Sequence, residues 1–231
     1  MHRLYEPPRS WTWPHYRFIQ WLLPTVCRLC GGHCVRGAEN VPDEGGALIA
    51  SNHVSHLDPP VVGTAIRRRS YYFAAAELFR NPIFGRLIRK CYAFPVKRGE
   101  ADRAALKAAI ELLEMGELLT MFPEGTRSHT GEISEFDLGA ALAASRARVP
   151  IIPCALSGTN LLLPRGAKWL RRGRVAVTFG EPIDTLKYGE KPGKEDLRRI
   201  TEEVEASVRA MQAAQQAWLA GQEPCRPKAK E

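Results

Sequence analysis

The stretch that decides the fold is Ala47-Leu48-Ile49-Ala50-Ser51-Asn52-His53-Val54-Ser55-His56-Leu57-Asp58-Pro59-Pro60. It begins as an apolar run of strand length, continues as a polar turn, and reaches two prolines that suit the first turn of a helix. Strand, turn and helix in succession are the repeating unit of α/β domains, whose reactive side chains lie in the loops that follow the strands. The stretch therefore predicts an α/β fold with functional groups after residue 51.

Within this stretch, His53 stands five positions before Asp58. In one continuous helix, five residues turn the chain by about 500° and leave the two side chains about 140° apart. We therefore predict that Asp58 is a helix N-cap, that Pro59 is the first helical residue, and that the preceding turn folds His53 back onto the carboxylate. Such a pair is a general base with a fixed tautomer. The alternative is that Asp58 only caps a helix and His53 is a satisfied polar residue at a strand end.

A second polar turn, Phe122-Pro123-Glu124-Gly125-Thr126-Arg127-Ser128, follows the apolar run 118–121. It supplies a glycine for close backbone approach, a hydroxyl, and an arginine whose planar fork suits phosphate or carboxylate. As an anion cradle it predicts a phosphorylated substrate. The alternative is an ordinary turn with a solvated arginine.

Together and in this order, the two stretches resemble the glycerolipid acyltransferases of the acylglycerophosphate type, whose N-H-x-x-x-x-D and F-P-E-G-T-R-S blocks are matched without substitution. Two weaker blocks also fit, Phe94-Pro95-Val96-Lys97-Arg98 and Val149-Pro150-Ile151-Ile152-Pro153, and the resemblance runs from about Val35 to Asp184.

The resemblance implies an acyltransferase that moves a fatty acyl group from acyl-CoA or acyl carrier protein to the free hydroxyl of a lysophospholipid, with lysophosphatidate as the first candidate. It implies His53 and Asp58 as the catalytic pair. The residues that it implies for binding the acceptor are Arg98, Glu124, Gly125, Thr126 and Arg127.

The chain departs from the family where many members carry a lysine before Glu-Leu-Phe and a Phe-Lys before a later glycine. Here the sequence reads Ala74-Ala75-Ala76 and Phe136-Asp137. Two cations that would face phosphate or a developing oxyanion are therefore absent. The alternative that the acceptor is a lysophospholipid with a larger headgroup, an aminolipid or a glycan lipid stays open. Lipid binding without turnover is a further alternative. The cations that would replace the missing pair are Lys97, Arg98, Arg127 or Arg80.

The composition is that of a folded protein with one domain: 231 residues, 45% hydrophobic and 25% charged. The net charge is +8, which suits either nucleic acid or the anionic surface of a membrane. We find no nucleic-acid motif, so we expect the membrane surface as the partner. The basic clusters that suit this surface are 67–69, Arg86 with 89–90, and 171–172 with Arg174.

Residues 1–34 are expected to form an aromatic-rich leader at the membrane interface. Three of the five tryptophans of the chain and several aliphatic residues lie between Trp11 and Leu29, with Arg17 and Arg28 nearby, and Pro24 is expected to kink the helix. The alternative is an amphipathic helix packed on the domain. We see no secretory signal and no apolar stretch of about 18 residues, so we expect a peripheral or monotopic protein on the cytoplasmic face of a membrane.

Cys27, Cys30, His33 and Cys34 raise the possibility of a metal site, but no second ligand pair follows, and we expect no metal. Cys27, Cys30 and Cys34 also fall at helical spacing, as small apolar residues on one helix face. The remaining cysteines, Cys91, Cys154 and Cys225, are expected to be reduced core or tail thiols.

The pattern between the motifs predicts a largely parallel or mixed sheet flanked by helices, in a domain spanning 35–220, with a disordered tail at 221–231. Strands are expected at 47–51, 71–75, 92–96, 117–122, 149–156 and 174–179. Helices are expected at 59–68, 82–90, 101–115, 137–147 and about 195–219.

No Gly-x-Ser-x-Gly elbow is present, so we expect direct attack of the acceptor hydroxyl on the thioester rather than an acyl-enzyme. We expect no cofactor beyond the thioester co-substrate. An oxyanion donor is required, worth about 3–4 kcal/mol in comparable enzymes, and backbone amides are our candidates.

Overall fold

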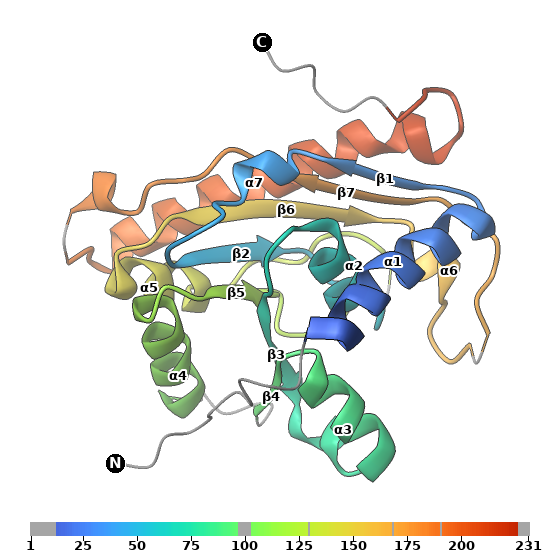
Figure 1. Ribbon diagram of the computed structural model, residues 1–231. Helices are drawn as coiled ribbons and strands as arrows, with labels where there is room; N and C mark the ends of the chain where they lie inside the picture. Colours follow the sequence, from blue (N-terminus) through green and yellow to red (C-terminus); the bar gives the residue numbers. More distant parts are fainter. Residues whose placement is uncertain (1–12, 97–102, 129, 168, 190, 226–231) are drawn as a thin grey trace.

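The structure is a computed structural model that describes residues 13–96, 103–128, 130–167, 169–189 and 191–225. Its centre is a seven-stranded sheet with the order β1-β7-β6-β2-β5-β3-β4 (Figure 1). All pairs are parallel except β6 with β7, which are antiparallel. The strands are β1 (His33–Arg36), β2 (Ala47–Ser51), β3 (Tyr71–Ala75), β4 (Ala93–Val96), β5 (Leu118–Met121), β6 (Ile151–Ser157) and β7 (Val175–Phe179).

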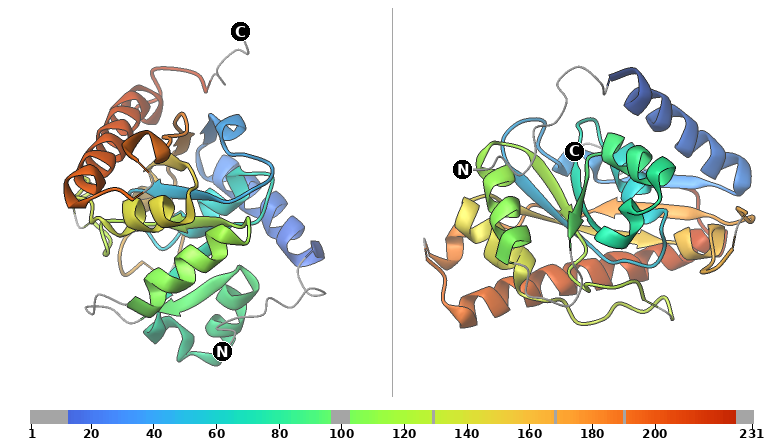
Figure 2. Two further views of the ribbon diagram at one scale, coloured as in Figure 1. Left: turned by 90° about the vertical axis from the view of Figure 1, so that its left-hand side faces the viewer. Right: turned by 90° about the horizontal axis from the view of Figure 1, so that it is seen from below.

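Helices cover both faces of the sheet (Figure 2). The α-helices are α1 (Trp13–Cys30), α2 (Asp58–Ala65), α3 (Pro82–Lys90), α4 (Arg103–Glu114), α5 (Gly139–Ala147), α6 (Thr159–Leu162) and α7 (Lys194–Leu219). Short 3-10 helices are η1 (Ala38–Asn40), η2 (Ala76–Phe79) and η3 (Leu186–Tyr188). Helices α1 and α2 lie on one face, and α4, α5 and α7 lie on the other. Helix α3 packs on η2 and on the edge strand β4.

Strand β2 shows how the sequence builds this arrangement. Ala47 and Ile49 point into the core beneath α1 and α2, whereas Leu48 and Ala50 point toward α4, α5 and α7. Every residue of β2 is buried, because the strand lies in the middle of the sheet with a helix layer on each face. A continuous apolar run rather than an alternating one is the pattern of such a strand.

The predicted α/β fold with a mixed sheet is confirmed, and each predicted strand and helix corresponds to an observed element. The boundaries proposed for the leader, domain and tail stay predictions. The elements that were missed are β1, which begins at His33 inside the proposed leader, the short helix α6, and the three 3-10 helices. The prediction that Asp58 is the N-cap was wrong by one residue, because Leu57 is the N-cap and Asp58 is the first helical residue.

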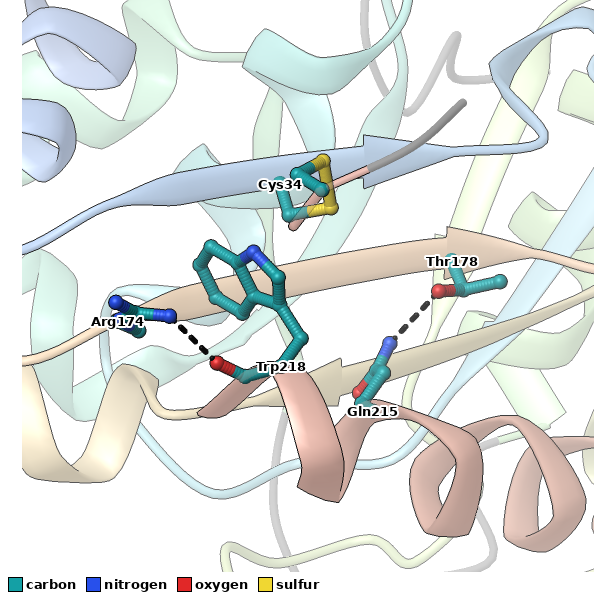
Figure 3. Close-up of a disulfide and its surroundings, with 6 residues drawn as sticks. Cys34, Arg174, Thr178, Gln215 and Trp218 are labelled. Atoms are coloured by element: carbon teal, nitrogen blue, oxygen red, sulfur yellow. Dashed lines mark hydrogen bonds between the residues drawn. A yellow bond between two sulfur atoms is a disulfide. The ribbon is translucent and has the colours of Figure 1, made fainter. Parts of the chain in front are cut away.

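The cysteine prediction was wrong for Cys34 and Cys225, which form a disulfide with a Cα–Cα distance of 5.6 Å (Figure 3). Helix α1 ends at Cys30, followed by Gly31 and Gly32 at positive φ, so Cys34 falls on β1 rather than on a helix face with Cys27. The end of α7 returns to this edge of the sheet and brings Cys225 to Cys34. Within the described residues, no group of three metal-ligating side chains comes together.

The end of α7 is fixed to the sheet by further contacts (Figure 3). The Arg174 guanidinium donates to the Trp218 carbonyl at 2.9 Å and lies over the indole ring. The Gln215 amide donates to the Thr178 hydroxyl at 2.9 Å and to the Ala155 carbonyl at 3.0 Å. These residues tie the last turns of α7 to strands β6 and β7.

Part of the basic charge assigned to a membrane surface serves the fold instead. The Arg68 guanidinium donates to the carbonyls of Pro42, Gly45 and Gly116 at 2.8–3.0 Å, which joins two loops. Arg69 pairs with Glu117. The triplet at 67–69 is therefore largely structural. No helix in the described part of the chain is long and apolar enough to cross a membrane.

Candidate active site

Three loops meet at the end of the sheet where the central parallel strands finish. Strand β2 lies between β5 and β6 and is parallel to both, so their carboxyl ends point the same way. The loop after β2 carries the His53–Asp58 motif, the loop after β5 carries the turn at 122–128, and β6 leads into α6. Segments about 70 and 100 residues apart in sequence are thereby brought together, as expected for functional loops of an α/β sheet.

The predicted contact between His53 and Asp58 is present. The His53 Nδ1 atom lies 2.7 Å from the Asp58 Oδ2 atom, and the carboxylate is fully buried. Because the carboxylate accepts the Nδ1 proton, the other ring nitrogen, Nε2, carries the lone pair. No described residue hydrogen-bonds to Nε2, and the side chain is 17% exposed. The pair has the geometry of a general base.

The buried Asp58 carboxylate accepts hydrogen bonds on both oxygens. Oδ2 accepts from the backbone amides of Val54 and Ser55 at 2.6 and 2.7 Å, in addition to the imidazole. Oδ1 accepts from the Thr159 hydroxyl at 2.5 Å. A buried charge is tolerated when its hydrogen-bonding capacity is met in this way. Thr159, the first residue of α6, thus supports the His53–Asp58 pair from the third loop.

The turn at 122–128 holds the backbone of His53 on both sides. The His53 amide donates to the Glu124 Oε1 atom at 2.7 Å, and the Ser128 amide donates to the His53 carbonyl at 2.8 Å. The other Glu124 oxygen accepts from the Ser134 amide at 2.9 Å. The Phe122 ring stacks on the imidazole with centroids 4.3 Å apart. The two sequence motifs therefore form one hydrogen-bonded unit.

The loop that carries His53 is anchored to β6 at its start. The fully buried Asn52 side chain donates to the Leu156 carbonyl at 2.9 Å and accepts from the Leu156 amide at 2.7 Å. This two-point contact substitutes for a strand–strand ladder bond where β2 ends. It fixes where the chain leaves the sheet, and hence where His53 begins its turn.

A buried thiol beside this unit is poorly suited to act as a nucleophile. Cys154 lies on β6, and burial raises its pKa to about 12, more than its contact with the Ser51 hydroxyl lowers it. A thiol with such a pKa stays protonated near neutral pH and is a poor nucleophile.

Comparison with known proteins identifies the family of the chain. An acyltransferase family model matches residues 33–157, which contain both motifs. The chain belongs to the glycerolipid acyltransferase family. It is 31% identical to the 1-acyl-sn-glycerol-3-phosphate acyltransferase of Bacillus subtilis (strain 168), over 85% of this chain and 96% of that protein. A second relative of the same name, from Streptococcus pneumoniae, is 32% identical over 79% of this chain and 66% of its own length.

A solved structure supports the same assignment. The crystal structure of the 1-acyl-sn-glycerophosphate (LPA) acyltransferase, PlsC, from Thermotoga maritima matches with a TM-score of 0.71 and 29% identity, covering 86% of this chain and 80% of that one. The predicted family and enzyme class are confirmed, and this chain is an acyltransferase of the glycerolipid type.

Four of the five residues assigned to acceptor binding lie in the turn at 122–128, which contacts the backbone of His53, and their roles stay predictions. Gly125 and Thr126 are exposed, and Gly125 has a φ of +66° with open space beside its Cα atom. Arg127 is half-buried. Glu124 is engaged with two backbone amides. Arg98 lies outside the described residues.

Sequence reasoning missed Thr159 and the role of Asn52. Asn52 belongs to the first motif, so its position was known, but nothing indicated a bond to Leu156, 104 residues away. Thr159 lies in a Ser-Gly-Thr-Asn segment after a predicted strand, in which the strand end was the only available signal. Asp137, which replaces a cation, accepts a hydrogen bond from the Gly139 amide at the start of α5 at 2.7 Å.

Proposed function

We propose that this acyltransferase transfers a fatty acyl group from a thioester, acyl-CoA or acyl carrier protein, to the free hydroxyl of lysophosphatidate, which yields phosphatidate. The observation that carries the proposal is the His53–Asp58 pair, with Nδ1 bound to the carboxylate at 2.7 Å and Nε2 available for a substrate proton. The names of the relatives support the acceptor.

In the proposed reaction, His53 Nε2 accepts the proton of the acceptor hydroxyl as its oxygen attacks the thioester carbonyl carbon. The tetrahedral intermediate then collapses, the carbon–sulfur bond breaks, and the thiolate takes the proton from the imidazolium. Asp58 stabilises the imidazolium and orients the ring in both steps. No covalent enzyme intermediate, metal or cofactor enters this scheme. Backbone amides in the loops around His53 remain our candidates for the oxyanion donors.

We infer that the acceptor phosphate lies over the turn at 122–128. The open space beside Gly125 allows close backbone approach, and Thr126 and Arg127 supply a hydroxyl and a guanidinium. Arg98 is the second proposed phosphate ligand. Glu124 would contribute to acceptor binding only by holding this turn against the loop of His53, because its carboxylate accepts hydrogen bonds from the backbone amides of His53 and Ser134.

We further propose that the enzyme acts on the cytoplasmic face of a membrane as a peripheral or monotopic protein. Helix α1 packs on α2 and buries Cys27, while Phe18 and Trp21 on its outer side are exposed, Trp21 to 64%. Aromatic rings favour the headgroup region, and the net charge of +8 favours an anionic leaflet.

The test is release of free thiol from palmitoyl-CoA by purified protein in detergent micelles, with and without lysophosphatidate. We expect release that requires lysophosphatidate and falls at least about 100-fold in His53→Ala. The matched control is His56→Ala, an exposed histidine of the same loop, which is expected to retain activity. If no acceptor supports His53-dependent release from acyl-CoA, the assay is repeated with acyl carrier protein, and failure there would overturn the catalytic proposal.

A second candidate acceptor is favoured by one observation. Ala74–Ala76 and Asp137 stand where many relatives carry cations, and Asp137 brings a negative charge instead. The same assay therefore includes lysophospholipids with larger headgroups, an aminolipid and a glycan lipid. His53-dependent release with one of these and not with lysophosphatidate would keep the mechanism and reassign the acceptor.

A further inference from the structure

Helix α3 exposes the face that an amphipathic helix normally buries. At about 100° per residue, Ile83, Phe84 and Leu87 fall within one sector of about 100°. All three are exposed, Ile83 to 80%. The side of the helix that faces the protein carries Gly85, which is buried, and Ile88, which is half-buried.

The seating of α3 explains why its apolar sector points outward. A Cβ atom on Gly85 would lie 2.9 Å from the Phe79 carbonyl oxygen, so the glycine lets the helix backbone approach η2 closely. The Asn81 side chain caps the helix by accepting from the Ile83 and Phe84 amides at 3.0 Å, and Pro82 takes the first helical position. The helix is therefore fixed in this orientation by its own N-terminus and by Gly85.

A cationic sector adjoins the apolar one. Arg86, Arg89 and Lys90 fall within a second sector of about 100°, next to Ile83 and Leu87. Arg86 and Lys90 are exposed, while the Arg89 guanidinium lies 4.8 Å from the centre of the Phe79 ring. Helix α3 contains no aspartate or glutamate. A short helix with an exposed apolar stripe flanked by arginine and lysine has the character of a segment that lies in the headgroup region of an anionic bilayer.

The position of α3 in the fold is compatible with contact with a bilayer. It lies beyond the edge strand β4, away from the layer formed by α5 and α7, and it is visible together with α1 in the view from below (Figure 2, right). Strand β4 ends at Val96, just before the segment assigned to acceptor binding through Arg98. Docking of α3 would thus bring a lipid surface next to the edge strand β4.

We propose that α3 is a second membrane-docking element, in addition to α1, and that it binds the surface of a bilayer containing anionic phospholipid. The apolar sector enters the headgroup region, and Arg86 and Lys90 contact lipid phosphates. This inference rests on the proposed action at a membrane surface, but it concerns attachment and not the chemistry at His53.

The test is co-sedimentation of the full chain with vesicles of one part phosphatidylglycerol to two parts phosphatidylcholine, compared with vesicles of phosphatidylcholine alone. We expect Ile83→Ser with Leu87→Ser to lower the partition coefficient about tenfold on the mixed vesicles. Arg86→Glu with Lys90→Glu is expected to lower it on mixed vesicles and to leave binding to neutral vesicles nearly unchanged. The matched control is Met115→Ser, an exposed apolar residue after α4, which should bind like the wild type.

Two further measurements separate the inference from the proposed function and from misfolding. Thermal unfolding of each variant should match the wild type, because the substituted side chains are exposed. Acyl transfer to a short-chain, monomeric lysophosphatidate without vesicles should be unchanged in the α3 variants. If the wild type fails this reaction, the proposed function falls while α3 docking is still tested by sedimentation.

Amide hydrogen exchange gives an independent readout on the wild type. Protection of residues 82–90 on addition of mixed vesicles supports docking of α3. Unchanged exchange there, or wild-type sedimentation of Ile83→Ser with Leu87→Ser, would overturn the inference. A dimer in the absence of lipid that dissociates in this double variant would also overturn it and assign the face to a second copy of the chain.

Discussion

Replacement of Thr159 by valine should impair the acyltransferase although no sequence motif contains this residue. Valine keeps the branched shape and removes only the hydroxyl, which donates to the buried Asp58 Oδ1 atom at 2.5 Å. A hydrogen bond to a charged group contributes about 1.5–3 kcal/mol. Without it, Asp58 keeps its three donors on Oδ2 but loses the anchor that stops rotation of the carboxylate.

If about 2 kcal/mol of this interaction is needed to orient Asp58 toward the imidazolium, kcat should fall about 30-fold. The KM for the acceptor should change little, because Thr159 is fully buried. The assay is free thiol release from palmitoyl-CoA at saturating lysophosphatidate, with urea unfolding measured in parallel. Thr159→Ser, which retains the hydroxyl, should restore most of kcat.

The matched control is Thr185→Val, which removes another buried hydroxyl, here a donor to the Val149 carbonyl at 3.1 Å and remote from the catalytic loops. It should lower the free energy of unfolding and leave kcat unchanged. A wild-type kcat in Thr159→Val would refute the reasoning. An equal loss of kcat in both variants would mean that general destabilisation, rather than Asp58 orientation, limits activity.

Three further outcomes are expected. Glu124→Gln places an NH₂ group against the Ser134 or His53 amide, so kcat should fall about 10- to 100-fold, whereas Glu135→Gln, at an exposed neighbour, should have no effect. A raised KM at unchanged kcat would instead indicate that Glu124 contacts the acceptor. Cys225→Ser opens a disulfide that joins residues 191 positions apart, so chemical unfolding should show that the free energy of unfolding falls by about 2–5 kcal/mol. Cys91→Ser, which removes a free thiol, is the control, and equal unfolding midpoints for the two variants would contradict this expectation. Burial, and to a smaller extent Arg28, lowers the pKa of His33 from 6.5 to about 4, so between these pH values the unfolded chain binds a proton that the folded chain does not. The free energy of unfolding should therefore fall by roughly 1–3 kcal/mol as the pH is lowered from about 6.5 to about 4. An unchanged pH dependence of unfolding in His33→Asn would contradict this assignment.

The central elements were predictable because their signals are local. The buried strands β2, β5 and β6 are continuous apolar runs, each followed by turn residues, and α3 opens with an Asn-Pro cap. The His53–Asp58 contact was predictable because a spacing of five residues separates the two side chains in a continuous helix, and the prolines favour a turn followed by a new helix. The turn that folds the imidazole back is stabilised by Asp58 itself, through the Val54 and Ser55 amides.

What the sequence did not indicate depends on contacts between distant segments. Strand β1 has four residues and is recognised only by its pairing with β7, about 140 positions later. Thr159 gains its role from the place where β6 ends beside β2. The disulfide requires that α7 bring Cys225 to the edge strand, and neither cysteine has a neighbouring residue that indicates it.

The pairing of β1 with β7 also bears on synthesis of the protein. Strand β1 has one partner in the sheet, and that partner begins at Val175, 139 residues after Arg36. At about 5–20 residues per second, β1 and the preceding helix α1 are synthesised roughly 7–28 s before β7. During that interval the aromatic side of α1 meets the surroundings of a nascent chain before the sheet is complete. If α1 acts at a membrane as proposed, the order of strands gives it this interval to reach the bilayer while translation is still in progress.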